Sequence, residues 1–208
     1  MPEKKIILIG GGGHCRSCID VIEENGSFRI VGIVEQPGRI GKKSILEYPI
    51  IGNDCELSSF KKLYDYALVT VGQTGSSSIR QNIFSNLKKS GFILPVIISP
   101  LAHVSKHATI GEGTIVMHQT VVNAGTQIGK NCILNTKSLV EHDAKVGNHT
   151  HISTSVVING NVSIGSGCFV GSNAIIVHGV KLPDDYFFKA GVLITSKNNG
   201  EAIKGKIS

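Results

Sequence analysis

Three ionisable side chains, Glu141, His142 and Asp143, stand next to one another in a stretch of mostly small and aliphatic residues. A neutral imidazole is a suitable general base near pH 7, and a carboxylate beside it can fix its tautomer and stabilise its protonated form. The triplet therefore predicts that His142 is a catalytic base and that Asp143 supports it. The alternative interpretation is a surface turn with incidental charges.

An aliphatic residue recurs every six positions around this triplet. The series of fourteen residues runs from Val104 to Leu182 and contains only Val, Ile and Leu, while the residue four positions after each of the first thirteen members is small or Val. Hexads of this kind are typical of a parallel β-helix with a narrow core, in which three hexads form one coil. Residues 104–183 would then supply four to five coils.

Stacking of the coils places residues 18 apart in one column. The column through His142 contains Gly160 and His178, so a small neighbour leaves the imidazole accessible to a substrate, which favours the catalytic interpretation. His118 and His178 share its place in the hexad but have no acid adjacent in sequence, whereas His151 is expected to contact a ligand. The spacing of histidines and carboxylates matches no zinc motif, so no metal is expected.

The first part of the chain contains a strand, a glycine turn, a helix and a second strand. Residues 6–9 form a short apolar run, residues 14–24 carry an amphipathic helix, and residues 30–34 form the next strand. The amides of the turn then lie at a helix N-terminus, which is a natural phosphate site. Because Cys15 takes the place of the third glycine of a dinucleotide fingerprint, the turn favours a nucleotide or nucleotide sugar.

Glu35 ends the second strand, where an acid can bind a ribose hydroxyl or a base. The alternative is a tight turn followed by a solvated acid. "YDYALVTVG" predicts another strand, which ends in a loop that starts at Gly72. "SIRQNIFSNLKKSGF" predicts a helix that stops at Gly91.

The formal net charge of +6 favours an anionic ligand. Nucleic acid is disfavoured, because the basic residues are scattered and aromatic residues make up only 5% of the chain. The apolar start "KKIILIGGGG" is too short for a secretory leader, and no segment reaches the roughly 18 apolar residues of a membrane span. With an odd number of cysteines, five, these features predict a cytoplasmic protein, and Cys15 and Cys18 are expected to pack inside a helix face.

The hexads resemble those of the hexapeptide-repeat acyltransferases, whose β-helix is left-handed, although the general rule for parallel crossovers would predict a right-handed one. "IGGGGH", "YPIIGND", "ILNTKSLVEHD" and "HISTSVVINGNVSIG" narrow the resemblance to the NeuD/PglD-like sugar acetyltransferases, over nearly the whole chain. The resemblance implies a Rossmann-like βαβ domain at residues 1–98, which binds a nucleotide sugar. A left-handed parallel β-helix that binds acetyl-CoA, with a C-terminal tail, would follow at residues 99–208.

The resemblance also assigns roles to single residues. It implies that His142 is the general base and that Asp143 orients it. The residues implied in substrate binding are Gly10, Gly11, Gly12, Gly13, His14, Glu35, Gln36, Gly72 and Asn135. The residues implied in acetyl-CoA binding are His151, Gly160, Ala190 and Gly191. Two departures stand out, since family members usually have an Asp pair where this chain has Glu35-Gln36, and the usual C-terminal "GxPAK" is reduced to "NNGEAIKGKIS".

Two enzymatic activities follow from the resemblance. The first is acetyl-CoA-dependent N-acetylation of a nucleotide-linked amino-dideoxy sugar in bacterial surface glycan biosynthesis, by direct transfer. The second is O-acetylation of sialic acid or a related nonulosonate. Family members are homotrimers with active sites between neighbouring β-helices. A non-catalytic β-helix that binds a sugar nucleotide and an NAD-dependent enzyme are further alternatives, and the triplet at residues 141–143 argues against the first of these.

Overall fold

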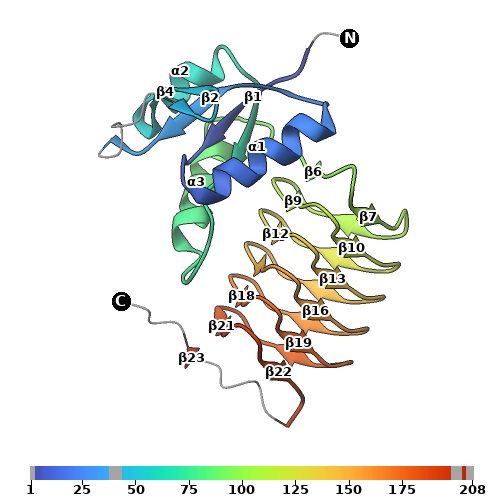
Figure 1. Cartoon of the computed structure of the whole chain (residues 1–208). Helices are drawn as coiled ribbons and strands as arrows, with labels where there is room; N and C mark the ends of the chain where they lie inside the picture. The colour runs from blue at the N-terminus through green and yellow to red at the C-terminus, as the bar shows by residue number, and fades with distance from the viewer. Residues whose placement is uncertain (1–2, 38–43, 198–202, 205–208) are drawn as a thin grey trace.

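The computed structural model describes residues 3–37 and 44–197 and the backbone of residues 203–204. An N-terminal α/β part sits on one end of a long β-helix (Figure 1). The predicted tail lies mostly outside the described residues. No described helix has the length and apolar character that spanning a bilayer requires.

The N-terminal part is built on a five-stranded sheet with the order β3-β4-β2-β1-β5. Its strands are β1 (Lys5–Ile9), β2 (Arg29–Glu35), β3 (Ser44–Ile45), β4 (Tyr48–Asn53) and β5 (Tyr66–Val69). All pairs are parallel except β3 with β4. Its helices are α1 (Gly13–Asn25), the 3₁₀ turn η2 (Asp54–Glu56), α2 (Leu57–Lys61) and α3 (Ser78–Lys89). The predicted strand, helix and strand of the first 35 residues are therefore confirmed within one residue.

Burial explains why this unit forms. The side chains of Ile6 to Ile9 are buried on both faces of the sheet, as a central parallel strand requires. Cys15 and Cys18 are free thiols on the buried face of α1, together with Ile19 and Ile22. Both cysteines therefore pack in the core, as their helical spacing predicted.

The β-helix consists of short strands that recur every six residues and form three parallel sheets. The first sheet contains β6 (Ile97–Ile98), β9 (Ile115–Val116), β12 (Ile133–Leu134), β15 (His151–Ile152), β18 (Phe169–Val170), β21 (Tyr186–Phe188) and the antiparallel β23 (Ile203–Lys204). The second sheet contains β7 (His103–Val104), β10 (Val121–Val122), β13 (Leu139–Val140), β16 (Val157–Ile158), β19 (Ile175–Ile176) and β22 (Leu193–Ile194). The third sheet contains β8 (Thr109–Ile110), β11 (Gln127–Ile128), β14 (Lys145–Val146), β17 (Ser163–Ile164) and β20 (Lys181–Leu182).

The aliphatic series of the hexads points into the core of the β-helix. Every member from Val116 to Leu182 is buried, and the small residues between them fill the remaining space. The β-helix is longer than the sequence series predicted, because Ile98 precedes it and Phe188 and Ile194 continue it in the same register. The strand β6 therefore belongs to the β-helix although it precedes residue 99.

The two parts share a hydrophobic core. Cys18 and Ile22 of α1 belong to the same buried cluster as Ile97, Ile115 and Ile133 of the first sheet. Helix α1 accordingly lies beside β6 (Figure 1). The first sheet of the β-helix is thus the face on which the N-terminal part packs.

Candidate active site

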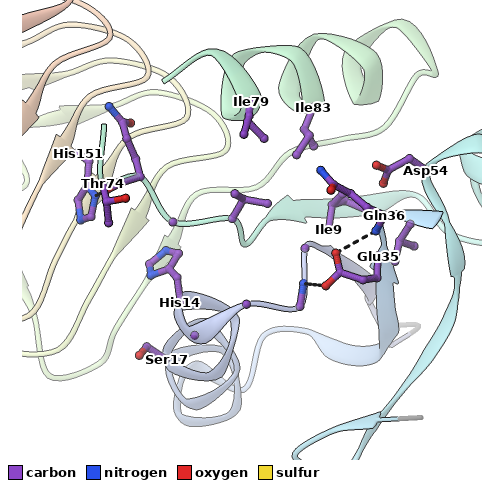
Figure 2. A pocket seen from close by; sticks show the side chains of 18 of the residues that line it. Ile9, His14, Ser17, Glu35, Gln36, Asp54, Thr74, Ile79, Ile83 and His151 are labelled. Carbon is purple, nitrogen blue, oxygen red and sulfur yellow. Dashed lines mark hydrogen bonds between the residues drawn. The ribbon is translucent and has the colours of Figure 1, made fainter. Parts of the chain in front are cut away.

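A cavity of about 540 Å³ lies where the carboxyl ends of β1 and β2 meet the first sheet of the β-helix (Figure 2). It brings together all nine residues that were predicted to bind the substrate. The predicted residues that line it are Gly10, Gly11, Gly12, Gly13, His14, Glu35, Gln36, Gly72, Asn135 and His151. His151, which the resemblance placed on the acetyl-CoA side, therefore lines the same cavity as the glycine turn.

The glycine turn offers backbone amides to this cavity. Gly12 is the N-cap of α1, has no side-chain cap, and the first turn of the helix contains no acidic residue. Gly10 has a φ of 102°, and a Cβ there would lie 2.3 Å from Cγ2 of Val71. None of the residues that line the cavity is Lys or Arg. The helix N-terminus therefore supplies positive potential to the cavity, and the buried guanidinium of Arg80, which acts on His14 and His151, adds to it from behind the lining residues.

Two neutral imidazoles stand at the β-helix end of the cavity. His151 Nδ1–H donates to the carbonyl oxygen of Gln73 at 2.8 Å, which leaves Nε2 as an acceptor 3.3 Å from Asn135 Nδ2. Burial lowers the pKa of His151 to about 4. Burial, followed by the charges of His151 and Arg80, lowers the pKa of His14 to about 3. Both rings are therefore uncharged at neutral pH.

His14 also holds a polar atom without a partner. Its Nε2 is buried and makes no hydrogen bond among the described residues. Its ring centroid lies 6.3 Å from that of His151. A ligand in the cavity would satisfy this nitrogen, which supports the predicted role of His14 in binding.

Glu35 has a structural partner at each carboxylate oxygen. Oε2 accepts from Gly11 N and Oε1 accepts from Gln36 N, both at 2.9 Å. A Cβ at Gly11 would lie 2.8 Å from Oε2. Glu35 therefore stabilises the glycine turn through these hydrogen bonds. Its contact with the ribose or the base of a ligand stays a prediction.

His142 and Asp143 form a hydrogen-bonded pair on the surface of the β-helix. Nδ1 of His142 lies 2.9 Å from Oδ2 of Asp143, and the two side chains are 56% and 59% exposed. Asp143 adopts the left-handed conformation with a φ of 61°, which recurs every six residues from Gly113 to Gly191. Because Asp143 engages Nδ1, the free nitrogen of His142 is Nε2.

Gly160 provides the space that His142 occupies. A Cβ on Gly160 would lie 2.6 Å from His142 Nε2. The ring centroid of His178, one coil further, lies 6.5 Å from that of His142. Glu141 instead accepts a hydrogen bond from Asn123 Nδ2 at 2.8 Å. The column that the repeat predicted is therefore present, with Nε2 of His142 turned towards Gly160.

The structure does not place the His142–Asp143 pair in the cavity. The pair stands at the corner between the second and third sheets, between β13 and β14, whereas Asn135 and His151 belong to the side of the first sheet. Ala190 and Gly191 are exposed near the last coil and do not line the cavity either. Within one chain the predicted residues therefore fall into three separate groups: the cavity, the corner of His142, and Ala190 with Gly191 near the last coil.

Several residues of the site were not assigned to it from the sequence. Gln73, Asp54 and Ile79 line the cavity through loops and a helix whose placement depends on the tertiary fold.

His118 has an acidic partner after all, since its Nε2 lies 2.8 Å from Oδ2 of Asp20 on α1. No group of three or more His, Cys, Asp or Glu side chains within the described ranges could hold a metal ion.

Family models match both parts of the chain. Residues 5–87 match the PglD N-terminal domain. Residues 107–142 match the bacterial transferase hexapeptide (six repeats), and residues 161–196 match the hexapeptide repeat of succinyl-transferase. The order of the matches is the order of the two structural parts.

Solved structures of similar chains have the same fold over almost their whole length. The acetyltransferase domain of PglB from Neisseria gonorrhoeae, in complex with acetyl coenzyme A, is 32% identical, with coverage of 93% of this chain and 91% of that chain and a TM-score of 0.85. PerB from Caulobacter crescentus, in complex with CoA and GDP-perosamine, is 29% identical, with coverage of 92% and 88% and a TM-score of 0.85.

A curated relative covers a shorter stretch. UDP-N-acetylbacillosamine N-acetyltransferase of Bacillus subtilis is 28% identical over 116 residues, which are 55% of this chain and about half, 51%, of that relative. The identity above 30% over most of the PglB domain, together with the family models, decides the classification. The chain belongs to the NeuD/PglD-like family of sugar acetyltransferases, with an N-terminal α/β domain followed by a left-handed β-helix of hexapeptide repeats.

Proposed function

We propose that this chain is an acetyl-CoA-dependent N-acetyltransferase that acts on the amino group of a nucleotide-linked amino-dideoxy sugar in bacterial surface glycan biosynthesis. The observation that carries the proposal is the His142–Asp143 pair, which leaves Nε2 of His142 free beside Gly160. The names of the relatives, which include perosamine N-acetyltransferase and UDP-N-acetylbacillosamine N-acetyltransferase, support the reaction type.

The proposed reaction is a direct transfer. The uncharged amine of the sugar attacks the thioester carbon of acetyl-CoA, so that a C–N bond forms and the C–S bond breaks. His142 Nε2 accepts the proton that the amine loses and passes it to the departing thiolate of CoA. Asp143 stabilises the imidazolium through Nδ1–H during this step. Because acetyl-CoA and nucleotide sugars are cytoplasmic metabolites, we place the reaction in the cytoplasm.

The cavity is the proposed nucleotide-sugar site. Its supports are the free amides at the N-terminus of α1 and the unpartnered Nε2 of His14. Asn135 and His151 would stand at the sugar end, since they lie on the first sheet of the β-helix. Acetyl-CoA would reach His142 along the β-helix, near Gly160.

Because the cavity and His142 are separate within one chain, an active site that is completed by a second subunit is favoured. The outward side chains of the second sheet form an apolar stripe that adjoins the corner of His142: Val121, Leu139, Val157, Ile175 and Leu193. Ile175 is 42% and Leu193 is 53% exposed. The third sheet carries Thr109, Gln127, Lys145, Ser163 and Lys181 at the same positions. We infer that a homotrimer covers the apolar stripe and brings His142 of one subunit to the cavity of the next.

The release of CoA from acetyl-CoA, followed with a thiol reagent, tests the proposal. Nucleotide-linked 4-amino-4,6-dideoxy sugars should serve as acceptors, and sialic acid should not. His142→Gln should lower kcat by about 10²- to 10⁴-fold. Lys181→Gln, which changes an exposed outward residue of the polar third sheet, is the control and should keep full activity.

Two results would contradict the proposal. Full activity of the His142→Gln variant would show that His142 is not the general base. Release of CoA with sialic acid alone would make the protein an O-acetyltransferase of the second predicted kind.

A further inference from the structure

The end of the cavity away from the β-helix is lined by Asp54, which is partly buried, and by Gln36, which is exposed (Figure 2). Asp54 and Gln36 line the cavity, and neither side chain makes a hydrogen bond or ion pair within the described part of the chain. Gln36 and Asp54 directly follow Glu35 and Asn53, which pair between β2 and β4, and Figure 2 shows both side chains at the same end of the cavity as Glu35. A carboxylate and a carboxamide without partners at one end of a cavity suggest a ligand with complementary groups.

Asp54 is not needed to cap the turn in which it lies. Asn53 is the N-cap of η2, and its side chain accepts from Cys55 N at 3.0 Å. Glu56 Oε2 accepts from Asn53 N at 2.8 Å and completes a capping box. The carboxylate of Asp54 is therefore left for another partner.

Asp54 is the only free carboxylate among the residues that line the cavity. Both oxygens of Glu35 already accept backbone N–H groups. Burial, and then the charge of Glu35, raises the pKa of Asp54. A ligand that donates hydrogen bonds to Asp54 would relieve this cost, whereas a ligand that presents only acceptors would add to it.

Apolar side chains bound the same end of the cavity. Ile79 and Ile83 of α3 project towards it from one side, and Ile9 lies nearby (Figure 2). Ile79 is 53% exposed, so a ligand could cover it. Apolar walls with a few polar groups at the end suit a planar heteroaromatic ring.

We propose that this end of the cavity is a nucleobase subsite that selects guanine, with Asp54 accepting from N1–H and the N2 amino group and the Gln36 carboxamide donating to O6. The proposal rests on the proposed function, in which the cavity binds a nucleotide sugar. Guanine alone among the common bases presents two adjacent donors and a carbonyl on one edge. Uracil presents a single N–H between two carbonyl oxygens. The negative charge of a carboxylate would repel these two oxygens. The acceptor would then be a GDP-linked amino sugar.

Calorimetric titration of the full chain with GDP and with UDP tests the subsite. GDP should bind at least about tenfold more tightly than UDP, since one good bidentate pair discriminates by about 5- to 150-fold. Asp54→Asn replaces one hydrogen-bond acceptor by a donor. It should weaken the binding of GDP by about tenfold or more and change the affinity for UDP by less than about threefold. Glu47→Gln removes an exposed carboxylate outside the cavity and should leave both affinities unchanged.

Binding of UDP as tightly as GDP, or an equal loss for both nucleotides in Asp54→Asn, would overturn the guanine subsite. A UDP-linked amino sugar that is acetylated in that case would leave the proposed function standing. Absence of binding by both nucleotides would overturn the nucleotide-sugar site and the guanine subsite together.

Discussion

His142 depends on the absence of a side chain at Gly160. A methyl group on Gly160 would lie 2.6 Å from Nε2 and 2.7 Å from Cε1 of His142, so the ring would have to move away from its position on Asp143. Gly160 is outside the left-handed region, so alanine can adopt its backbone conformation. We expect Gly160→Ala to lower kcat about 100-fold, because small displacements of catalytic groups have effects of that size.

The matched control for this variant is Gly75→Ala. A Cβ on Gly75 would meet no atom within 4 Å. Both variants should keep the melting temperature of the parent protein, because the contact made by Gly160→Ala is with an exposed, flexible ring. Equal kcat values for Gly160→Ala and Gly75→Ala in the CoA-release assay would show that the position of His142 is not critical.

His151 links stability to pH. Its pKa is lowered by burial to about 4, whereas histidine in an unfolded chain has a pKa of about 6.5. Between these values the unfolded chain binds a proton that the folded chain excludes, so the free energy of unfolding falls as the pH falls. We expect His151→Gln to reduce this slope by about 1.4 kcal/mol per pH unit in urea titrations between about pH 6.5 and 4.5.

His107→Gln is the control for the pH experiment, since His107 is exposed on the β-helix. It should leave the slope as in the parent protein. An unchanged slope in His151→Gln would mean that His151 is protonated in the folded state, and that its burial does not hold it neutral.

At the scale of the element, one corner of the β-helix tolerates only glycine. Gly111, Gly129, Gly147 and Gly165 follow one another between the third and first sheets, and a Cβ on any of them would lie 2.5 to 2.7 Å from the backbone of the next coil. The backbone of the next coil cannot move away from such a Cβ, because each coil is hydrogen-bonded to its neighbours. This crowding explains why the sequence repeats glycine directly after the aliphatic residue at these positions.

Gly147 is the best place to test this crowding. A Cβ there would lie 2.5 Å from both Gly165 C and Ser166 N. We expect Gly147→Ala to lower the free energy of unfolding by about 1–3 kcal/mol, as overpacking does. Urea unfolding followed by circular dichroism would measure the loss, with Gly75→Ala as a substitution that meets no neighbour. A loss below about 0.5 kcal/mol would mean that the coils can separate locally.

At the scale of the whole molecule, the sequence predicted what depends on near neighbours. Each coil of a β-helix contacts only adjacent coils, so the hexads from Val104 to Leu182 predicted the sheets, and the column through His142 predicted its proximity to Gly160 and His178. The fixed hand of the coils came from the resemblance, since the general rule for crossovers gives the opposite hand.

Contacts between the two parts could not be predicted. His118 meets Asp20 across 98 residues, and His151 meets the carbonyl of Gln73 across 78 residues. Both pairs depend on the angle at which α1 and the loop after β5 pack on the first sheet. No local pattern encodes this angle, so the sequence around His118 contains no sign of the acid that the fold brings to it.

The apolar stripe of the second sheet leads to a prediction about the oligomeric state and the activity of the protein. If a homotrimer buries Ile175, then Ile175→Glu places an unpaired charge in the interface, which is strongly unfavourable. The variant should sediment as a monomer and lose at least about tenfold in CoA release, because His142 no longer meets the cavity of a neighbour. Its melting curve should remain cooperative, since Ile175 points outward and its neighbour Ile176 fills the core. Ser163→Glu introduces the same charge on the polar third sheet and should remain trimeric and active. Monomeric, active parent protein would instead mean that one chain completes its own site.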